Sequence, residues 1–392
     1  MAKSARTQWS EDPRAALRPG EGFDLSTFDR AGTPGFAGDK DMGKELTDTR
    51  GALLNQLQER LFAEGRAGGK RSVLVVVQGL DTAGKGGIAR HVMGYVDPQG
   101  VHLRSFGVPT EEERSHHYLW RIENALPAPG RIGVFDRSHY EDVLVVRVEN
   151  LVEQSVWEDR YDEINQWEKR LVDSGTVLLK FAMMVSHEEQ GLRLMERLDR
   201  PDKHWKYAPS DLDTRAKWER YQEAYQAVFD RTNTDYAPWY VLPADRKWYP
   251  RLAVTEILTR TLIEMDLRWP RVRWSDDVQR RKLAETMTTA SLAESLSNTE
   301  EVVTEAIQES IEVRLAAAAL IGEDTDTTAK QLDERRRELL VDMERNIAQK
   351  RELLEARRQK PAKEPAQAKP AKEPAQAKPA KGRQPKQKKK QK

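Results

Sequence analysis

Residues 73–87 read VLVVVQGLDTAGKGG, an unbroken apolar run followed by a glycine-rich loop. A run of β-branched residues and Leu predicts a strand that is buried on both faces of a sheet. From Gly79 to Lys85 the loop fits the phosphate-binding pattern G-x-x-x-x-G-K, and a helix is expected to start near Gly86. Backbone N–H groups at such a helix start bind phosphate oxygens. The stretch therefore predicts a P-loop between a buried strand and a helix.

Two residues of this loop depart from the usual phosphate-binding pattern. The position after Lys85 is Gly86, where Ser or Thr commonly helps to hold Mg²⁺. Asp81 lies inside the loop, and a carboxylate is a ligand that a hard cation prefers. An Asp in a tight turn also commonly bonds to nearby backbone N–H groups. Taken alone, the loop leaves both roles of Asp81 open.

Apolar runs and helical periods alternate along the chain after the loop. This alternation predicts an α/β fold with a parallel sheet that is covered by helices on both faces. Further strands are expected in GVHLRSF (100–106), RIGVF (131–135), TVLLKFAMMV (176–185) and PWYVLPA (238–244). Helices are expected at 46–61, at 110–126 and around 211–230. The second of them begins with a capping box formed by Thr110 and Glu113.

The composition sets limits on the class of protein. The chain has 392 residues, which is enough for one large domain or two ordinary ones. It has no Cys, which excludes structural disulfides and thiolate metal sites. No apolar stretch has the length of a membrane span, and residues 1–20 lack the apolar segment of a signal peptide. We therefore expect a cytoplasmic protein without a membrane partner.

Shifts in composition divide the chain into parts. Residues 1–40 are rich in Gly, Pro and Asp and are expected to form an irregular arm. Residues 41–270 are expected to form the domain that contains the P-loop, with a helical lid at about 187–235. Residues 276–358 are charged and free of Pro and aromatic residues, so they are predicted to be helical. They form either a solvated appendage or an oligomerisation helix, and a homo-oligomer is expected.

Residues 359–392 form a basic tail. They contain eleven Lys and one Arg against two Glu, so their net charge is +12 − 2 = +10 and the rest of the chain carries 1 − 10 = −9. The segment PAKEPAQAK occurs at 361–369 and again at 370–378, and such a sequence is expected to stay disordered. The tail either solubilises the protein or attracts a polyanion such as polyphosphate or nucleic acid.

A second acid follows the strand expected at 131–135. Asp136 stands at the carboxyl end of this strand, which is the position of a Walker B aspartate and the edge where open α/β sheets bind ligands. Arg137 follows it and has a bidentate fork for phosphate. The order Asp-Arg-Ser also fits a simple helix N-cap, with Arg137 exposed to solvent. Ser138 is compatible both with this N-cap and with a phosphate site.

Basic residues gather in the expected lid. They are Arg193, Arg197, Arg200, Lys203 and Lys206. Arg193 and Arg197 are four positions apart, so they share one face of a helix. Cations that neutralise the oxygens of a transferring phosphoryl group are a main source of catalysis in P-loop kinases. The alternative is a solvated helix face on which these cations pair with neighbouring glutamates such as Glu196.

Four blocks of the sequence resemble the polyphosphate kinase 2 family. They are VLVVVQGLDTAGKGG (73–87), FDRSHYEDVLVVRV (135–148), DKHWKYAPSDLDTRAKWERY (202–221) and APWYVLPADRKWYPRLAV (237–254). The resemblance runs from about Phe23 to Pro270. It implies a P-loop kinase core with a helical lid, and the transfer of a phosphoryl group between inorganic polyphosphate and nucleotides with Mg²⁺. The resemblance leaves open whether AMP, ADP or both are the acceptors.

The resemblance also implies roles for individual residues. Asp81 and Asp136 would hold Mg²⁺ and manage the acceptor phosphate. The loop that cradles phosphate would consist of Gly79, Thr82, Ala83, Gly84, Lys85, Gly86 and Gly87. The cations that hold phosphate oxygens in the transition state would be Arg137, Arg193 and Arg197. The residues along the path of polyphosphate would be Lys203 and Lys206. Asp211 matches a lid acid to which no task is assigned.

Two other functions stay open on the sequence. One is an ATP-dependent kinase that phosphorylates a nucleotide or a small molecule on the same scaffold. The other is a scaffold protein that binds polyanions through its basic tail and uses the core as a nucleotide sensor. An assay with polyphosphate, AMP or ADP, and Mg²⁺ separates the three functions.

Overall fold

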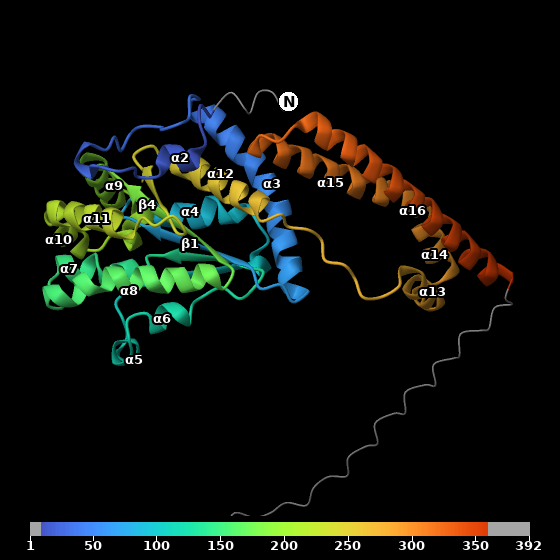
Figure 1. The fold of residues 1–392 in the computed structure, drawn as a ribbon, viewed down its shortest axis with the longest axis horizontal. Helices are drawn as coiled ribbons and strands as arrows, with labels where there is room; N and C mark the ends of the chain where they lie inside the picture. Colours follow the sequence, from blue (N-terminus) through green and yellow to red (C-terminus); the bar gives the residue numbers. More distant parts are fainter. Residues whose placement is uncertain (1–8, 360–392) are drawn as a thin grey trace, which may run out of the picture. The chain divides into compact units, whose positions relative to one another are not determined.

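The computed structural model describes residues 9–359 and contains one five-stranded parallel sheet (Figure 1). The strands are β1 (Ser72–Gln78), β2 (Val101–Ser105), β3 (Ile132–Asp136), β4 (Thr176–Met184) and β5 (Trp239–Pro243). Their order in the sheet is β2-β3-β1-β4-β5. Every strand that the sequence predicted is confirmed, and the phosphate-binding loop follows the central strand.

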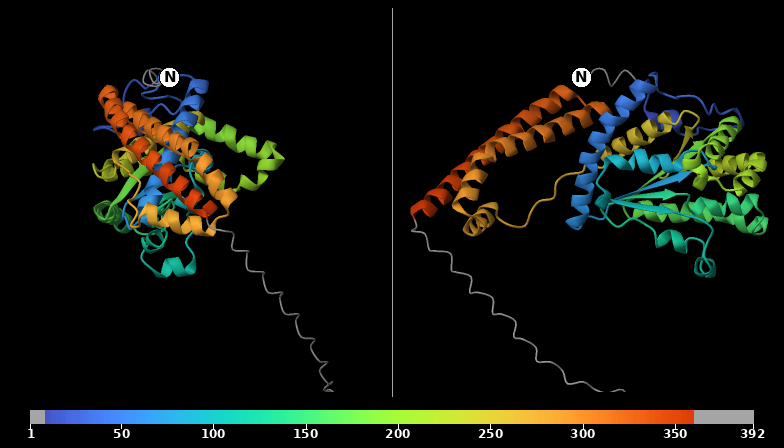
Figure 2. Two further views of the ribbon diagram at one scale, coloured as in Figure 1. Left: turned by 90° about the vertical axis from the view of Figure 1, so that its right-hand side faces the viewer. Right: turned by 180° about the vertical axis from the view of Figure 1, so that it is seen from behind.

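Alternate residues of β1 point to opposite faces of the sheet, as the geometry of a strand requires. Val73, Val75 and Val77 belong to one apolar core, whereas Leu74 and Val76 belong to another. The first core is covered by α3 (Lys40–Arg66), α4 (Lys85–His91) and α12 (Trp248–Glu264). The second is covered by α6 (Trp120–Glu123), α7 (Val145–Val148), α8 (Gln154–Asp173) and α11 (Trp218–Thr232). Figure 2 shows the two helical layers on either side of the sheet.

The described part of the N-terminal arm packs on both faces of the sheet. It contains only α2 (Pro13–Leu17) and the 3-10 turn η1 (Leu25–Thr27) as helical elements. Trp9 and Phe36 form an antiparallel bridge and join the core of α3 and α12. Leu25 joins the opposite core. The arm is irregular in backbone, but its apolar side chains are buried.

The single helix predicted at 110–126 is wrong. The capping box of Thr110 and Glu113 is confirmed, but α5 (Glu111–Ser115) ends after five residues. His116 has an extended backbone, and its ring stacks on Trp120 at 4.2 Å between ring centroids. The next helix, α6, starts only at Trp120. The capping box specified where the helix begins, and no sequence signal specified where it ends.

The long helix predicted around 211–230 is also interrupted. The structure has α10 (Ser210–Ala216) and α11, separated at Lys217, whose ψ of 22° leaves the helical region. The Arg215 side chain donates to the His187 carbonyl oxygen at 2.5 Å and to Gln190 Oε1 at 3.1 Å. Because of the break, α10 is tied to the start of α9 (His187–Asp199). Other short turns are η2 (Met93–Tyr95), η3 (Pro98–Gly100), η4 (His139–Asp142) and η5 (Pro201–Lys206).

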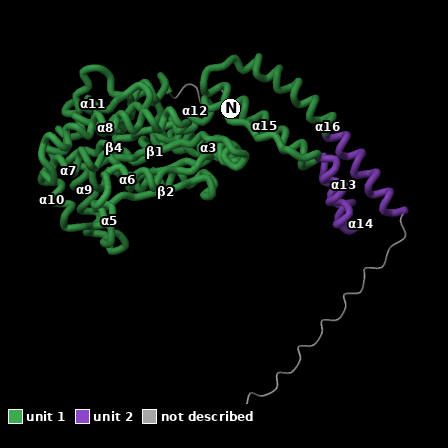
Figure 3. The backbone as a smooth tube through the Cα atoms, turned by 60° about the horizontal axis from the view of Figure 1, so that its bottom comes forward, with its two compact units in different colours: residues 1–275, 301–342 green, residues 276–300, 343–392 purple. Residues whose placement is uncertain are grey.

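The helices after residue 275 are α13 (Asp276–Thr286), α14 (Thr289–Ser297), α15 (Thr299–Ile321) and α16 (Thr325–Gln359). They are divided between two compact units (Figure 3). Residues 301–342 belong to the unit that contains the sheet, whereas residues 276–300 and 343–359 form the other. Of the tail predicted at 359–392, Gln359 is the last residue of α16, and residues 360–392 lie outside the described residues.

Apolar side chains of these helices contact the chain's own residues. Val313, Ala317 and Leu320 of α15 belong to the core that α3 and α12 cover. In the other unit, Leu354 of α16 packs with Ala284 and Leu292. Part of the apolar surface of α15 and α16 is therefore buried within each unit. Among residues 9–359, no helix has both the length and the apolar character needed to cross a membrane.

Candidate active site

The P-loop connects β1 to α4 at the carboxyl edge of the sheet. Gly84 is the N-cap of α4 and has a φ of 107°, a conformation that strongly favours glycine. Lys85 is the first residue of α4, and its ammonium donates to the Gly79 carbonyl oxygen at 2.7 Å and to the Leu80 carbonyl oxygen at 3.3 Å. The lysine side chain therefore folds back over the loop, where it can bridge phosphate oxygens.

Thr82 has an unusual backbone for a β-branched residue. Its φ is 68°, in the left-handed region, and its buried hydroxyl has no hydrogen-bond partner among the described residues. Backbone strain of this kind is common at functional sites, where the surrounding structure holds it in place. The Thr82 carbonyl oxygen accepts from Arg193 Nη1 at 2.9 Å, which helps to fix the loop in this conformation.

A charged cluster lies where β3 ends. Residues Val77 and Asp136 are paired in the register of β1 and β3, so Asp136 stands beside the start of the P-loop. The next residue, Arg137, has a φ of 64° and donates from its backbone N–H to the Val77 carbonyl oxygen at 3.1 Å. Its guanidinium Nη2 is 3.0 Å from Asp81 Oδ1 and its Nη1 is 4.0 Å from Glu141 Oε2. The loop aspartate and the residue after the Walker B position therefore form an ion pair.

The charges of this cluster act on Lys85. Burial, together with the nearby Arg137, lowers the pKa of the Lys85 ammonium below its usual value. Three carboxylates oppose this shift of the pKa: Asp81, Asp136 and Glu141. Burial raises the pKa of Glu141 itself, although Arg137 and Lys85 pull it down. Lysine, arginine and these carboxylates therefore converge on one small region, and Glu141 was not predicted to belong to it.

The carboxylates of this cluster suit Mg²⁺, which proteins commonly bind through one or two carboxylates, waters and substrate phosphates. Within residues 9–359, no group of three or more His, Asp or Glu is placed to hold a metal ion unaided. Asp81 and Asp136 supply hard oxygen ligands beside Lys85. The donor set therefore fits a magnesium ion that is shared with bound phosphate groups, and it does not form a complete protein cage.

On the other side of the loop, Arg193 of α9 is almost fully buried, with 5% of its surface exposed. Besides the Thr82 carbonyl oxygen, its Nη2 donates to the carbonyl oxygens of Ala244 at 2.7 Å and Asp245 at 2.9 Å. Its Nε donates to Glu189 Oε1 at 2.7 Å. All three guanidinium nitrogens are thus bonded to the protein, so Arg193 ties the P-loop to the end of β5.

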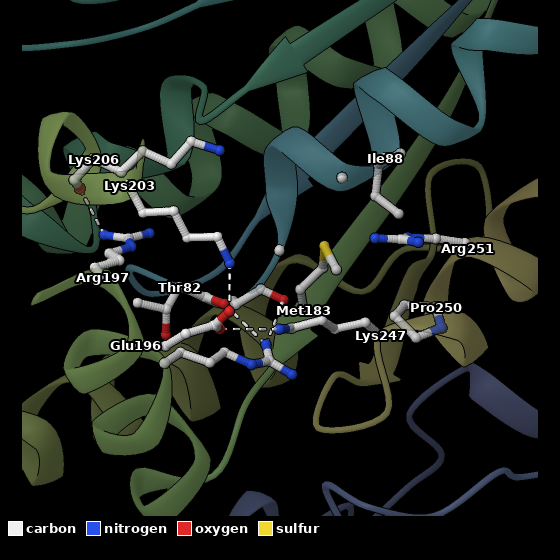
Figure 4. A pocket seen from close by; sticks show the side chains of 14 residues that line it. Thr82, Ile88, Met183, Glu196, Arg197, Lys203, Lys206, Lys247, Pro250 and Arg251 are labelled. Atoms are coloured by element: carbon white, nitrogen blue, oxygen red, sulfur yellow. Dashed lines mark hydrogen bonds and ion pairs between the residues drawn. The ribbon is translucent and has the colours of Figure 1, made fainter. Parts of the chain in front are cut away.

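A cavity of about 190 Å³ lies between the P-loop and the segment 193–206 (Figure 4). The loop contributes Thr82, Ala83, Gly84 and Gly87 to its wall. The basic residues that line the cavity are Arg193, Arg197, Lys203, Lys206, Lys247 and Arg251. Four of the five predicted lid cations therefore meet at one cavity beside the loop, and Arg200 does not line it. The cluster of Asp81 and Arg137 does not line this cavity.

Sequence reasoning missed Lys247 and Arg251, which follow β5. They lie in the block ADRKWYPR, whose basic residues were not assigned a role. Among the described residues, the Arg251 guanidinium has no hydrogen-bond or ion-pair partner. Burial and the like charges of Arg193 and Arg90 lower its pKa. A partly desolvated arginine without an internal anion is well placed to bind an anionic ligand.

The other lid cations are already paired to different degrees. Arg197 Nη1 donates to the Lys206 carbonyl oxygen at 2.8 Å and to Asp211 Oδ2 at 3.2 Å. Asp211, which had no predicted task, therefore positions Arg197. Lys203 is paired with Glu196, and the Lys206 ammonium lies 5.0 Å from the centre of the exposed Trp205 ring. Lys206 and Arg251 are thus the cavity cations most available to a ligand.

A parallel sheet with a P-loop after its central strand, and an acid at the end of the adjacent strand, defines the class of P-loop kinases. The family model for polyphosphate kinase 2 matches residues 37–269. The chain therefore belongs to the polyphosphate kinase 2 family and is a phosphotransferase. The helices from α13 onward lie outside the matched residues.

Individual relatives agree with this assignment. The chain is 47% identical over 254 residues to an AMP/ADP-polyphosphate phosphotransferase from Meiothermus ruber, covering 65% of this chain and 94% of that protein. It is 37% identical over 263 residues to an ADP-polyphosphate phosphotransferase from Rhodopseudomonas palustris, covering 64% and 89%. The solved structure of a polyphosphate kinase 2 from Arthrobacter aurescens TC1 is 46% identical, with a TM-score of 0.69 over 71% of this chain and 98% of that one.

Proposed function

We propose that this enzyme transfers a phosphoryl group between inorganic polyphosphate and both AMP and ADP, with Mg²⁺. The similar protein from Meiothermus ruber carries both acceptors in its name, and the one from Rhodopseudomonas palustris carries ADP. The proposal rests on one feature of this chain. Residues of the P-loop line a cavity with many cations, and Asp81 of the same loop pairs with Arg137 in a cluster of carboxylates.

The cation-lined cavity suits the polyphosphate chain. Arg251, Lys206 and Arg197 approach it from separate segments, so they can contact several phosphate groups of one chain. Each of these cations neutralises charge that would otherwise repel a second polyanion. Arg193 is bonded to three backbone carbonyl oxygens, so we propose that it positions the P-loop and does not itself contact phosphate.

The carboxylate cluster suits the phosphate of the nucleotide. Arg137 would bind its oxygens, and Asp81 holds the guanidinium of Arg137 in place at 3.0 Å. Asp81 and Asp136 would hold Mg²⁺, which supplies charge neutralisation for phosphates when bound. Lys85 belongs to the same loop and would contact the phosphoryl group that is transferred. Removing one well-placed donor from such a site typically lowers kcat by about 10²-fold to 10³-fold.

The test is an assay of the purified chain with long-chain polyphosphate and either AMP or ADP. We expect ADP and ATP to form from AMP, and ATP to form from ADP, only when Mg²⁺ is present. Addition of EDTA should stop both reactions, and excess Mg²⁺ should restore them. Transfer from ATP to another acceptor without any use of polyphosphate would instead support an ATP-dependent kinase. Formation of product from ADP alone would restrict the proposal to that acceptor.

A further inference from the structure

One carboxylate lies inside the cation-lined cavity. Glu196 of α9 lines the cavity together with the lid and core cations. Its Oε1 is 2.5 Å from the Lys203 ammonium and 3.4 Å from Arg200 Nη1. Its Oε2 is 3.8 Å from the Lys247 ammonium. In Figure 4 the Glu196 carboxylate is linked by dashed lines to both Lys203 and Lys247.

The partners of Glu196 come from two parts of the fold. Arg200 and Lys203 belong to the turn after α9, whereas Lys247 follows β5. The hydrogen bond from Lys203 holds the pKa of Glu196 below its usual value, so this carboxylate is ionised at neutral pH. It thus joins the lid segment to the core through ion pairs, in the position where phosphate oxygens would meet the same cations.

We propose that the Glu196 carboxylate competes with polyphosphate for Lys203 and Lys247. It thereby lowers the affinity of the cavity for polyphosphate. This proposal rests on the assignment of the cavity to polyphosphate. A bound chain must replace the contacts of the carboxylate with its own, and it also meets the negative charge of Glu196. The residue therefore weakens binding, and it keeps the cavity from holding inorganic phosphate or other small anions.

The test compares E196Q with the unaltered protein in two measurements. The first is the direct binding of labelled long-chain polyphosphate without nucleotide, over a series of salt concentrations. Glutamine keeps the size and a carbonyl oxygen of the side chain, but it removes the charge. We expect the Kd for polyphosphate to fall about fivefold at low salt, because one like charge is removed beside the ligand. The slope of log Kd against log salt should steepen by roughly one, because one more cation is free to neutralise phosphate.

The second measurement is inhibition of turnover by inorganic phosphate. E196Q should be inhibited at about fivefold lower phosphate concentration, since the freed lysines can bind a small anion. The matched control is E188Q, which removes the same charge from the exposed Glu188 in the first turn of α9, outside the cavity. This control should leave Kd, salt slope and inhibition unchanged.

The outcomes separate this inference from the proposed function. If E196Q binds polyphosphate with equal or weaker affinity while the unaltered protein turns it over, Glu196 only orients Lys203 and the inference is wrong. If the unaltered protein neither binds nor uses polyphosphate, the proposed function itself fails. A fall of Kd in E188Q equal to that in E196Q would show a general charge effect and would also overturn the inference.

Discussion

Two residues of the active site have left-handed backbones although neither is glycine. Thr82 belongs to the P-loop and Arg137 follows the Walker B position. Each is fixed by a bond to a neighbouring element, Thr82 through Arg193 and Arg137 through Asp81. The strain lies at the carboxyl edge of the sheet beside the P-loop, and the folded structure compensates for it through these bonds.

The loop aspartate gives the first prediction. Replacing Asp81 with Asn keeps the size of the side chain but removes the charge that pairs with Arg137 at 3.0 Å. We expect turnover with polyphosphate to fall by at least about 10²-fold, because Asp81 is the ligand that we propose for Mg²⁺ and it also anchors Arg137. Product formation and the Tm measured by differential scanning fluorimetry check this result.

The control for this variant is D235N, because Asp235 is exposed and paired with Arg18 away from the loop. D235N should keep full activity. We expect the Tm of D81N to stay close to that of the unaltered protein. A large loss of Tm in D81N would mean that Asp81 serves mainly to build the turn.

Arg193 and Arg251 give the second prediction, because both line the cavity but differ in their bonds. Arg193 is buried and bonded to several carbonyl oxygens, so R193A leaves buried acceptors without partners and should lower stability by about 3–5 kcal/mol. Arg251 has no internal partner among the described residues, so R251A should keep its Tm. R251A should raise the KM for polyphosphate about tenfold, which corresponds to about 1.4 kcal/mol.

Thermal unfolding and steady-state kinetics of the two variants test this contrast. The KM for AMP should change little in R251A, because Arg251 lines the cavity that we assign to polyphosphate. Equal losses of Tm in both variants would show that Arg251 is also a structural residue. An unchanged KM for polyphosphate in R251A would remove it from the binding path.

At the scale of elements, β1, β3 and β5 could be predicted because they are buried along nearly their whole length and read as apolar runs. β4 is buried over most of its length, whereas β2 lies at the edge of the sheet and is half-buried to exposed. The helix breaks at His116 and Lys217 could not be predicted. His116 stacks on Trp120, and the break at Lys217 lets Arg215 reach the start of α9. Both breaks depend on contacts between segments, which a periodic pattern within one segment does not contain.

The candidate site also combines features that one segment of sequence predicts with features that depend on contacts between segments. The positions of Asp81, Lys85 and Asp136 at one edge follow from the rule that parallel strands end together. The role of Arg193 does not follow from sequence, because its partners Ala244 and Asp245 lie about fifty residues further along the chain. Lys247, Arg251 and Glu141 were missed for a similar reason: the fold, and not the spacing, brings them to the loop.

A buried network beneath the site gives the third prediction. His139, Tyr140, Glu168 and Lys180 are fully buried, and they join the segment after β3 to α8 and β4. Glu168 accepts from Lys180 Nζ at 2.7 Å and from the Tyr140 hydroxyl at 2.8 Å. His139 Nε2 lies 3.1 Å from Glu168 Oε1. The network fixes the segment that carries Arg137 and Glu141.

Burial lowers the pKa of His139 from its usual value of 6.5, so the folded protein keeps it neutral. The unfolded chain takes up this proton first as the pH falls. The stabilisation that comes from keeping His139 neutral is therefore fully present above pH 6.5. It is lost as the pH falls through the pKa that His139 has in the folded protein. A single group of this kind changes the free energy of unfolding by up to about 1.4 kcal/mol per pH unit.

Measurements of Tm between pH 7.5 and 5 in H139Q test whether His139 makes the protein less stable as the pH falls. We expect the fall of Tm below pH 6.5 to be shallower in H139Q than in the unaltered protein, whatever the Tm at neutral pH. H204Q is the control, because His204 is exposed, and its pH profile should match that of the unaltered protein. A profile of H139Q parallel to that of the unaltered protein would show that His139 is not the group that titrates.

At the scale of the molecule, part of the C-terminal extension is integral to the sheet-containing unit. Arg260 of α12 donates to the Leu320 carbonyl oxygen at 3.0 Å and is paired with Asp12 of the N-terminal arm at 3.3 Å. It also bonds to the buried Glu256, which is paired with Arg50 at 2.7 Å. One arginine thus links the arm, α12 and α15. This part of the extension lies outside the family match, yet Arg260 of the matched domain bonds to it.

The basic tail gives the last prediction, which concerns the charge of the whole chain. Residues 360–392 carry a net charge of +12 − 2 = +10, and the remaining residues carry 1 − 10 = −9. An acidic body repels polyphosphate at long range, and a tethered cationic segment raises the local concentration of this polyanion. We therefore propose that the tail increases the apparent affinity for long chains without taking part in the chemical step.

Deletion of residues 360–392 should raise the KM for long-chain polyphosphate about tenfold at low salt, with kcat and the KM for AMP unchanged. The difference should shrink as salt is added, because screening weakens the attraction between the tail and the polyanion. A variant of full length with the eleven tail Lys replaced by Gln separates charge from length and should behave like the deletion. If both variants keep the original KM at low salt, the tail does not recruit polyphosphate, and the cations around the P-loop alone account for its binding.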